Sequence, residues 1–380
     1  MASPSLYLSF FSSAFSSVFT LFFARLFKPQ TVPQRDLTGQ TAIVTGSNSG
    51  IGLWIAIQLA RQGADVCLAC RNQEKGDAAV SFIQSQLNNN SNSSSGQVNG
   101  AGVRPGNVFC WKVDFSDMES VHAFCSRWNA QGTEIDMLVH NAGIADAPVG
   151  GRRYNEKGRD VVYVTNVIGS VLMTHLLEQR LSRNARVVFT SSGGSYNGLN
   201  SFLLPRPPRL DEASRNVVVR VWRSIKKALG IKDSAAVVYG QTKAHQILFA
   251  ALLQKHFSAS QGTNRTAHAF APGFTQSAIF NKFEMTWRTW LYDPVFSMLR
   301  LTEKLVATDT DEGAKTGAWL AACGSEKGVE GGRYWEWMRK EVSVVDFSRA
   351  KMGEEAFMKK AKDVWKEWEM DAGCKWDLAI

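Results

Sequence analysis

Cysteine is scarce in this chain, and the cysteines show no pairing pattern. Six cysteines among 380 residues are too sparse for a small secreted disulfide scaffold and suit a reducing compartment. Cys67 and Cys70 have the spacing of a redox or zinc site, but no second such pair and no cluster of histidines accompanies them. They fall in an apolar run that predicts a strand, which would point the two sulfurs to opposite faces. We therefore interpret both as buried strand residues and expect no metal site.

Charge is absent from residues 1–24, which are rich in Phe, Leu, Ser and Val. Arg25 and Lys28 follow the apolar run, whereas a cleaved signal peptide carries its positive charge before it. The length suits a transmembrane helix, and the positive-inside rule would leave the bulk of the chain in the cytosol. Four serines at positions 12, 13, 16 and 17 weaken the hydrophobicity, so an embedded hairpin, an interfacial helix or a plain globular helix are alternatives. We expect residues 1–30 to anchor the chain to the endoplasmic reticulum or a lipid droplet.

The net charge of +9 is concentrated in one segment. Residues 205–233 hold eight Lys or Arg and three Asp or Glu, a local charge of +5. No nucleic-acid-binding motif accompanies this charge, so we expect no nucleic-acid partner. The segment belongs to a basic insert at 195–235, which predicts either a solvated helix over the substrate cleft or an amphipathic helix in contact with a membrane.

A strand–helix–strand unit begins at Thr41. Thr41–Thr45 predicts a strand, Gly46–Gly52 a glycine-rich turn, residues 53–62 a helix and Asp65–Ala69 a second strand. Such a turn binds a dinucleotide pyrophosphate against the helix N-terminus. Glycine is needed there because a Cβ would block the approach of the backbone to the phosphate.

The end of the second predicted strand bears on the choice of cofactor. An acidic residue at this place would bind the ribose hydroxyls of NAD, whereas an arginine accommodates the 2′-phosphate of NADP. Cys70 stands where the acid would be, and Arg71 and Asn72 follow. We predict NADP(H), with an ordinary surface role for Arg71 as the alternative.

Polar residues follow the later predicted strands. Asp114, Asn141 and Ser192 end the strands at 108–113, 135–139 and 186–190. Ligands of open α/β sheets bind at the carboxyl ends of the strands, so these residues and Gly46 should share one site. Between the last two strands, residues 159–181 predict a long helix that contains Asn166.

Tyr239 and Lys243 lie one helical turn apart, which places phenol and ammonium on the same side of a helix. A nearby positive charge favours the phenolate and would lower the pKa of the tyrosine towards working pH. Such a pair can act as an acid, but only beside a cofactor site.

Two further segments complete the pattern. Residues 88–106 are low-complexity and predict a flexible, disordered loop. Residues 280–301 are dense in Phe, Trp, Met and Leu and predict an apolar lid, although ordinary core is the alternative.

The ordered motifs resemble those of the short-chain dehydrogenase/reductases, and most closely the retinol dehydrogenase-like branch. The motifs are Thr45–Gly46-xxx-Gly50-x-Gly52, Ala69–Asn72, Asn141–Gly143, Asn166–Gly169, Ser192, Tyr239-xxx-Lys243, Pro272–Gly273, Gly332-x-Tyr334–Trp335 and a final helix with Trp365. The resemblance covers residues 38–370 and implies a single α/β domain. Its sheet would be a doubly wound, parallel Rossmann sheet of seven strands in the order 3-2-1-4-5-6-7.

The resemblance also implies residue roles. Tyr239 would be the acid/base, Lys243 would lower its pKa and bind the nicotinamide ribose, Ser192 would hydrogen-bond the substrate oxygen, and Asn166 would hold a water in the proton relay. The implied cofactor-binding residues, besides Tyr239 and Lys243, are Gly46, Ser49, Gly50, Ile51, Gly52, Arg71, Asn72, Asp114, Phe115, Asn141, Ala142, Gly143, Pro272, Gly273 and Thr275. The family usually has two asparagines where this chain has His140 and Asn141, a departure that bears on strand packing.

These observations predict an NADPH-preferring oxidoreductase for a lipophilic carbonyl or alcohol, retinal-, steroid- or long-chain-like. One alternative is a carbon–carbon double-bond reductase of the protochlorophyllide reductase type. Another is a non-catalytic cofactor-binding scaffold on a lipid surface. A homodimer is the assembly we consider.

Overall fold

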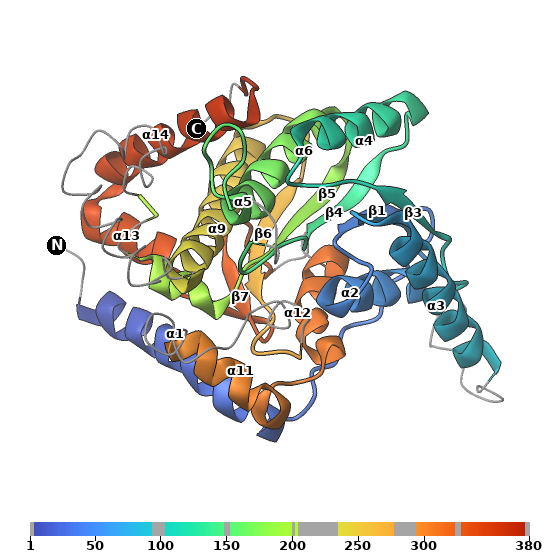
Figure 1. The fold of residues 1–380 in the computed structure, drawn as a ribbon, viewed down its shortest axis with the longest axis horizontal. Helices are drawn as coiled ribbons and strands as arrows, with labels where there is room; N and C mark the ends of the chain where they lie inside the picture. The colour runs from blue at the N-terminus through green and yellow to red at the C-terminus, as the bar shows by residue number, and fades with distance from the viewer. Residues whose placement is uncertain are drawn as a thin grey trace.

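A single eight-stranded sheet organises the part of the chain that the computed structural model describes, residues 4–92, 103–147, 153–199, 202–203, 235–276, 294–323 and 328–376. The strand order is β3-β2-β1-β4-β5-β6-β7-β8, seen near the centre of Figure 1. The strands are β1 (Thr41–Thr45), β2 (Asp65–Cys70), β3 (Val108–Lys112), β4 (Ile135–His140), β5 (Leu181–Thr190), β6 (Thr266–Ala271), β7 (Tyr334–Glu336) and β8 (Arg339–Glu341). The predicted doubly wound α/β fold and the order of its first seven strands are confirmed.

The eighth strand is a correction to the predicted seven. β1 to β7 pair in parallel, whereas β8 pairs antiparallel with β7 through a tight turn. Trp337 and Met338 form this turn with φ of 53° and 56°. Two consecutive positive φ values are those of a type I′ hairpin turn, which normally requires Asn or Gly. The sequence therefore gives no sign of a hairpin here.

Helices cover both faces of the sheet. One face packs α2 (Gly50–Arg61), α3 (Gln73–Asn92) and α12 (Thr310–Cys323), and the other packs α4 (Met118–Gln131), the helical run Val161–Arg180 and α9 (Ala235–Ala259) (Figure 1). Cys67 lies in one hydrophobic core and Cys70 in the other. The two cysteines are buried and free, as the alternation of a strand predicts.

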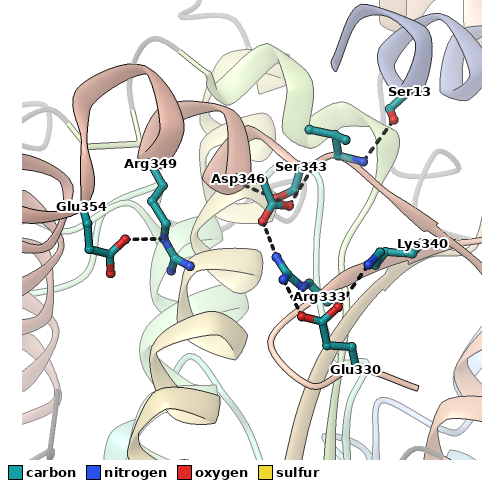
Figure 2. Close-up of polar contacts among 9 residues, drawn as sticks. Ser13, Glu330, Arg333, Lys340, Ser343, Asp346, Arg349 and Glu354 are labelled. Carbon is teal, nitrogen blue, oxygen red and sulfur yellow. Dashed lines mark hydrogen bonds and ion pairs between the residues drawn. The ribbon is translucent and has the colours of Figure 1, made fainter. Parts of the chain in front are cut away.

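Several predicted boundaries change. Residues 88–92, predicted as loop, extend α3. The predicted final helix with Trp365 is α14 (Glu354–Ala372). A further helix that was not predicted, α13 (Val344–Met352), precedes it, and Gly353 with φ of 84° divides the two. Ser343 and Asp346 form a capping box at the start of α13 (Figure 2), which fixes that start independently of hydrophobic periodicity.

The two predicted inserts are described only at their ends. Most of the basic insert, residues 204–234, lies outside the described residues, while η4 (Gly193–Gly198) and residues 199 and 202–203 are described. Residues 280–293 of the predicted lid also lie outside. Residues 294–301 belong to α11 (Pro294–Val306), a strongly amphipathic helix.

The first helix, α1 (Pro4–Phe23), continues into a short 3₁₀ turn, η1 (Ala24–Leu26), and lies beside α11 at the lower edge of Figure 1. Among the described residues, the run Val161–Arg180 is long and apolar enough to cross a membrane by length and composition alone. Since 72% of it is buried in the fold, we interpret it as a core helix.

Candidate functional site

The glycine-rich turn between β1 and α2 is closed by the end of β4. A Cβ on Gly46, whose φ is 64°, would lie 2.8 Å from Cα of Ala142. One on Gly52 would lie 2.4 Å from Nδ2 of Asn141. Side chains at these glycines would therefore push the two loops apart. Thr45, whose role the sequence did not reveal, accepts hydrogen bonds at Oγ1 from the backbone N–H groups of Asn141 and Ala142, both at 2.9 Å.

Asn141 supports this turn with its side chain. Its Nδ2 donates to the backbone oxygens of Thr45 (3.1 Å) and Gly46 (3.2 Å). His140 before it is buried, bonds Thr174 at 2.8 Å and stacks on Phe189. Burial lowers the pKa of His140 to about 3, so it is neutral at working pH. His140, which replaces the first asparagine of the family's pair, is thus accommodated by its contacts with Thr174 and Phe189.

The other predicted cofactor residues line the same sheet edge. Ser49 is the N-cap of α2 without a side-chain capping bond, and Gly50, with φ of 61°, and Ile51 begin that helix. Such an uncapped N-terminus is the place where a pyrophosphate binds. Arg71 is exposed directly after β2, whereas Asn72 caps α3 by accepting from the N–H of Lys75 at 2.8 Å.

Asp114 and Phe115 follow β3. Asp114 Oδ1 accepts from both the N–H and the hydroxyl of Ser116, at 2.9 and 2.7 Å. Phe115 is buried, and a Cβ on Gly169 would lie 2.6 Å from its ring. The Phe115 side chain therefore belongs to the core, and its backbone oxygen also lies against Gly169.

Asn166 lies in a π-helical segment, Val164–Ile168, inside the long helix. Its Oδ1 accepts from the N–H of Ile144 (2.8 Å), and its Nδ2 donates to the oxygen of Ile144 (2.9 Å) and to Thr242 (3.1 Å). The side chain thus fixes the loop that follows Gly143. Such π-helical turns are frequent at functional sites, and here the backbone carbonyl of Asn166 in this turn accepts a hydrogen bond from a side chain of α9.

Gln246 bridges Asn166 and Lys243. Its Nε2 donates to the backbone oxygen of Asn166 at 2.9 Å, and its Oε1 accepts from Nζ of Lys243 at 3.0 Å. Gln246 is almost fully buried. A protein side chain therefore links Asn166 to Lys243, and the sequence did not reveal this link because it depends on the packing of α9 against the helical run Val161–Arg180.

Ser192, Tyr239 and Lys243 converge at the carboxyl ends of β5 and β6. Ser192 begins η4 and hydrogen-bonds Tyr239 side chain to side chain. Ser191 instead donates to the backbone oxygen of Lys243 at 2.8 Å, which favours Ser192 as the residue that faces a ligand. Lys243 is buried and donates to the backbone oxygen of Thr190 at 2.8 Å.

Burial controls both pKa values of the pair. It raises the pKa of Tyr239 to about 12, against a lowering effect of the Ser192 hydrogen bond. It lowers the pKa of Lys243 to about 7. The expected lowering of the tyrosine pKa by Lys243 is therefore not seen: desolvation raises the pKa of Tyr239, and the opposing effect comes from the hydrogen bond of Ser192. Nζ lies 5.3 Å from the centre of the Tyr239 ring.

The loop after β6 closes the site. Gly273 has φ of 73°, and Thr275 is buried and bridges to Thr308. A Cβ on Gly273 would lie 3.6 Å from Nε1 of Trp337, the residue in the strained β7–β8 turn. That indole N–H is buried and has no hydrogen-bond partner among the described residues. Trp337 is a third residue near the site, after Thr45 and Gln246, that sequence reasoning missed.

The comparisons with known proteins agree with this architecture. A family model described as short chain dehydrogenase matches residues 40–203. The chain is 32% identical over 304 residues to "Dehydrogenase/reductase SDR family member 13" of Homo sapiens, an alignment that covers 79% of this chain and 66% of that protein. It is 28% identical to "Retinol dehydrogenase 12" of Mus musculus over 310 residues, covering 81% of each.

Solved structures share the fold. A crystal structure of a putative uncharacterized protein from Mycobacterium paratuberculosis superposes with a TM-score of 0.58 at 23% identity, covering 92% of this chain and all of that one. With the sheet order, the glycine turn and these relatives together, the chain belongs to the short-chain dehydrogenase/reductase family, on its retinol dehydrogenase-like branch.

Proposed function

We propose that this protein is an oxidoreductase that transfers hydride between a nicotinamide cofactor and a lipophilic carbonyl or alcohol. The observation that carries the proposal is the convergence of Ser192, Tyr239 and Lys243 at one sheet edge, with Tyr239 bonded to Ser192. A non-catalytic scaffold would have no use for this arrangement of groups.

The cofactor supplies the hydride, and the protein's residues handle the proton and the position of the substrate. Ser192 Oγ donates to the carbonyl oxygen. Tyr239 donates its phenolic proton to the same oxygen as the carbon–oxygen double bond becomes a single bond. A pKa of about 12 keeps Tyr239 protonated before reaction, which is the form that reduction needs.

Lys243 compensates the negative charge that remains on Tyr239. Its Nζ is held by the Thr190 carbonyl and Gln246, and the phenolate that forms favours its charged state. Gln246 in turn donates a hydrogen bond to the backbone carbonyl of Asn166. The site therefore connects the proton donor to the π-helical turn through two side chains.

The proposed cofactor is NADP(H), with Arg71 as the residue that binds the 2′-phosphate. Two features support this choice. Arg71 is exposed directly after β2, and the end of β2 carries Cys70 in place of the acidic residue that would bind the ribose of NAD. The glycine turn and the uncapped helix α2 suit the pyrophosphate.

A retinal-, steroid- or long-chain-like substrate is proposed from two sources. One relative is named for retinol, and the N-terminal region beside η4 is rich in exposed apolar side chains. Membrane association through that region, at the endoplasmic reticulum or a lipid droplet, forms part of the proposal.

The test uses the full-length protein in mild detergent with NADPH or NADH and a panel of lipophilic aldehydes, ketones and conjugated alkenes. We expect loss of NADPH absorbance with carbonyls and slower loss with NADH. Turnover of alkenes alone would indicate a double-bond reductase. Tight NADPH binding without turnover of any substrate would contradict the enzyme proposal.

A further inference from the structure

The first helix of the chain is amphipathic in the opposite sense to a helix on a water-soluble protein. Its buried residues are Phe10, Ser13, Ser17 and Thr20, and Leu6 is partly buried against the core. Three of the four buried side chains are polar, whereas a surface helix normally turns its apolar face inward.

Each polar side chain of this inward face has a partner in the fold. Ser13 accepts a hydrogen bond at Oγ from the N–H of Val342 at 3.0 Å (Figure 2). Thr20 and Ser17 donate to Oε1 of Glu336, at 3.0 and 3.5 Å. Phe10 stacks on Phe347 of α13 with ring centres 4.2 Å apart. The helix is therefore fastened to the domain along its whole polar side.

The outward face of α1 is mainly apolar, although Ser5, Ser9 and Ser12 are also exposed on the helix. Phe11 and Phe15 are 63% and 69% exposed, Leu8 near the start of α1 is 73% exposed, and Leu26 in η1 is 79% exposed. Of the large hydrophobic side chains that are exposed in the described part of the chain, nine of fifteen lie between Tyr7 and Phe27. An environment of water would not favour this distribution.

Helix α11 extends the same surface. It lies beside α1 (Figure 1), and Arg25 donates to the backbone oxygen of Leu305 at 3.2 Å. Met298, Leu301 and Leu305 are exposed on it, three more of the fifteen. We call the exposed apolar residues of Tyr7–Phe27 and α11 the α1–α11 face.

Charge points to the kind of partner. The first 35 residues contain Arg25, Lys28 and Arg35 and no acidic side chain, and Arg25 and Lys28 are exposed at the end of the face. On α11, Glu303 is buried and paired with Arg300. Within α1, η1 and α11 as described, the face thus offers a basic end and no unpaired acidic side chain, which suits anionic headgroups better than a second copy of the same face.

We propose that the α1–α11 face docks flat on an anionic lipid surface, with α1 lying in the interface and not crossing the bilayer. Crossing would pull Thr20 and Ser17 away from buried Glu336 and Ser13 away from the N–H of Val342. Leaving these groups without partners in the fold is costly. Docking keeps every one of these bonds and buries the exposed phenylalanines and leucines in the acyl region.

The first test measures co-sedimentation of the full-length protein with vesicles of phosphatidylcholine, with and without phosphatidylserine. We expect Leu301→Glu/Leu305→Glu to lower binding at least about tenfold, because α11 contributes to the face. The matched controls Phe82→Glu and Met370→Glu change exposed apolar residues elsewhere and should bind like wild type. Arg25→Glu/Lys28→Glu should remove the preference for phosphatidylserine.

Unchanged binding of the α11 double variant would overturn the proposal, because α1 alone would then hold the membrane. Loss of binding accompanied by a change from dimer to monomer in detergent would also overturn it, in favour of a second copy as the partner. Thermal unfolding of each variant checks that the fold is retained.

The second test establishes topology. Ser5→Cys, at the exposed start of α1, is treated with a membrane-impermeant maleimide after docking on sealed vesicles. Equal labelling with and without detergent is the expected result, since an interfacial helix leaves its start on the outer side. Protection that only detergent removes would show a spanning helix and overturn the proposal. Neither test requires catalytic activity, so both are independent of the proposed reaction.

Discussion

Tyr239 is the residue on which the proposed reaction depends most directly. Tyr239→Phe removes the proton donor and should lower kcat at least about 100-fold, the usual size of acid catalysis. NADPH binding, followed by its fluorescence, should persist. Tyr196→Phe is the control, because that hydroxyl donates to the backbone oxygen of Val342 at 3.1 Å. Reduction by Tyr239→Phe at the wild-type rate would exclude this tyrosine as the donor.

The pH dependence of kcat/KM can show whether Gln246 tunes the pKa of Lys243 or has a purely structural role. Gln246→Leu removes an acceptor from the charged form of Lys243 and should lower the lysine pKa below about 7. The alkaline limb of kcat/KM then moves to lower pH. Gln246→Glu places a negative charge beside Nζ and should move the limb to higher pH. Loss of activity in both variants without any shift of the limb would mean that Gln246 only packs.

Arg71 governs the proposed choice of cofactor. Arg71→Ala should raise KM for NADPH about tenfold and leave KM for NADH almost unchanged, because only NADPH carries the 2′-phosphate. Arg104→Ala, another exposed arginine, is the control. If both cofactors were affected equally, Arg71 would have no selective role.

Ser192, Tyr239, Lys243 and Asn166 could be predicted as site residues because they belong to motifs with a recognisable order and spacing. Gln246 and Trp337 could not be predicted in this way. Gln246 becomes significant only because the fold places it between Lys243 and the Asn166 carbonyl. Trp337 lies near Gly273 only because two residues adopt positive φ without being glycine, a strain that no propensity predicts.

At the scale of elements, α1 and the edge of the sheet form one unit. A Cβ on Gly193, next to Ser192, would lie 2.3 Å from Oγ of Ser17. The helix expected as a separate anchor therefore touches the loop that carries the proposed substrate-binding serine. Its serines, which weakened the membrane interpretation, are the side chains that face the fold.

Glu336 makes this junction sensitive to pH. Burial raises its pKa to about 7, against lowering effects of Thr20 and Ser17 and with a further raising effect of Glu341. The folded chain then binds more protons than the unfolded chain between the ordinary carboxyl value and about 7. Stability should be highest below this range and fall as pH rises through it.

Glu336→Gln keeps an acceptor for Thr20 and removes the titration. We expect its melting temperature to change much less than that of wild type between pH 5 and pH 8, a window set by the wild-type pKa of about 7. The loss in wild type should reach up to about 3 kcal/mol. Parallel pH profiles for the two proteins would mean that Glu336 does not titrate in this range.

For the whole molecule, periodicity and glycine positions were enough to predict the doubly wound sheet and the order of its first seven strands. They were not enough to predict β8, the division between α13 and α14, or the place of α1. Each of these depends on contacts between distant segments or on a single backbone conformation. Local pattern contains no information about such contacts.

The attachment of α1 has a consequence for the order of folding. Thr20 and Ser17 contact Glu336, which lies 316 and 319 positions further along the chain. Ser13 contacts Val342, which lies 329 positions further along. During synthesis this helix is made more than 300 residues before its polar partners on β7 and after β8. A hydrophobic helix would thus remain without these partners while the intervening chain is translated. During this time a lipid surface could bind the apolar face of α1. The polar face of the helix would bind the domain later, once the domain has folded.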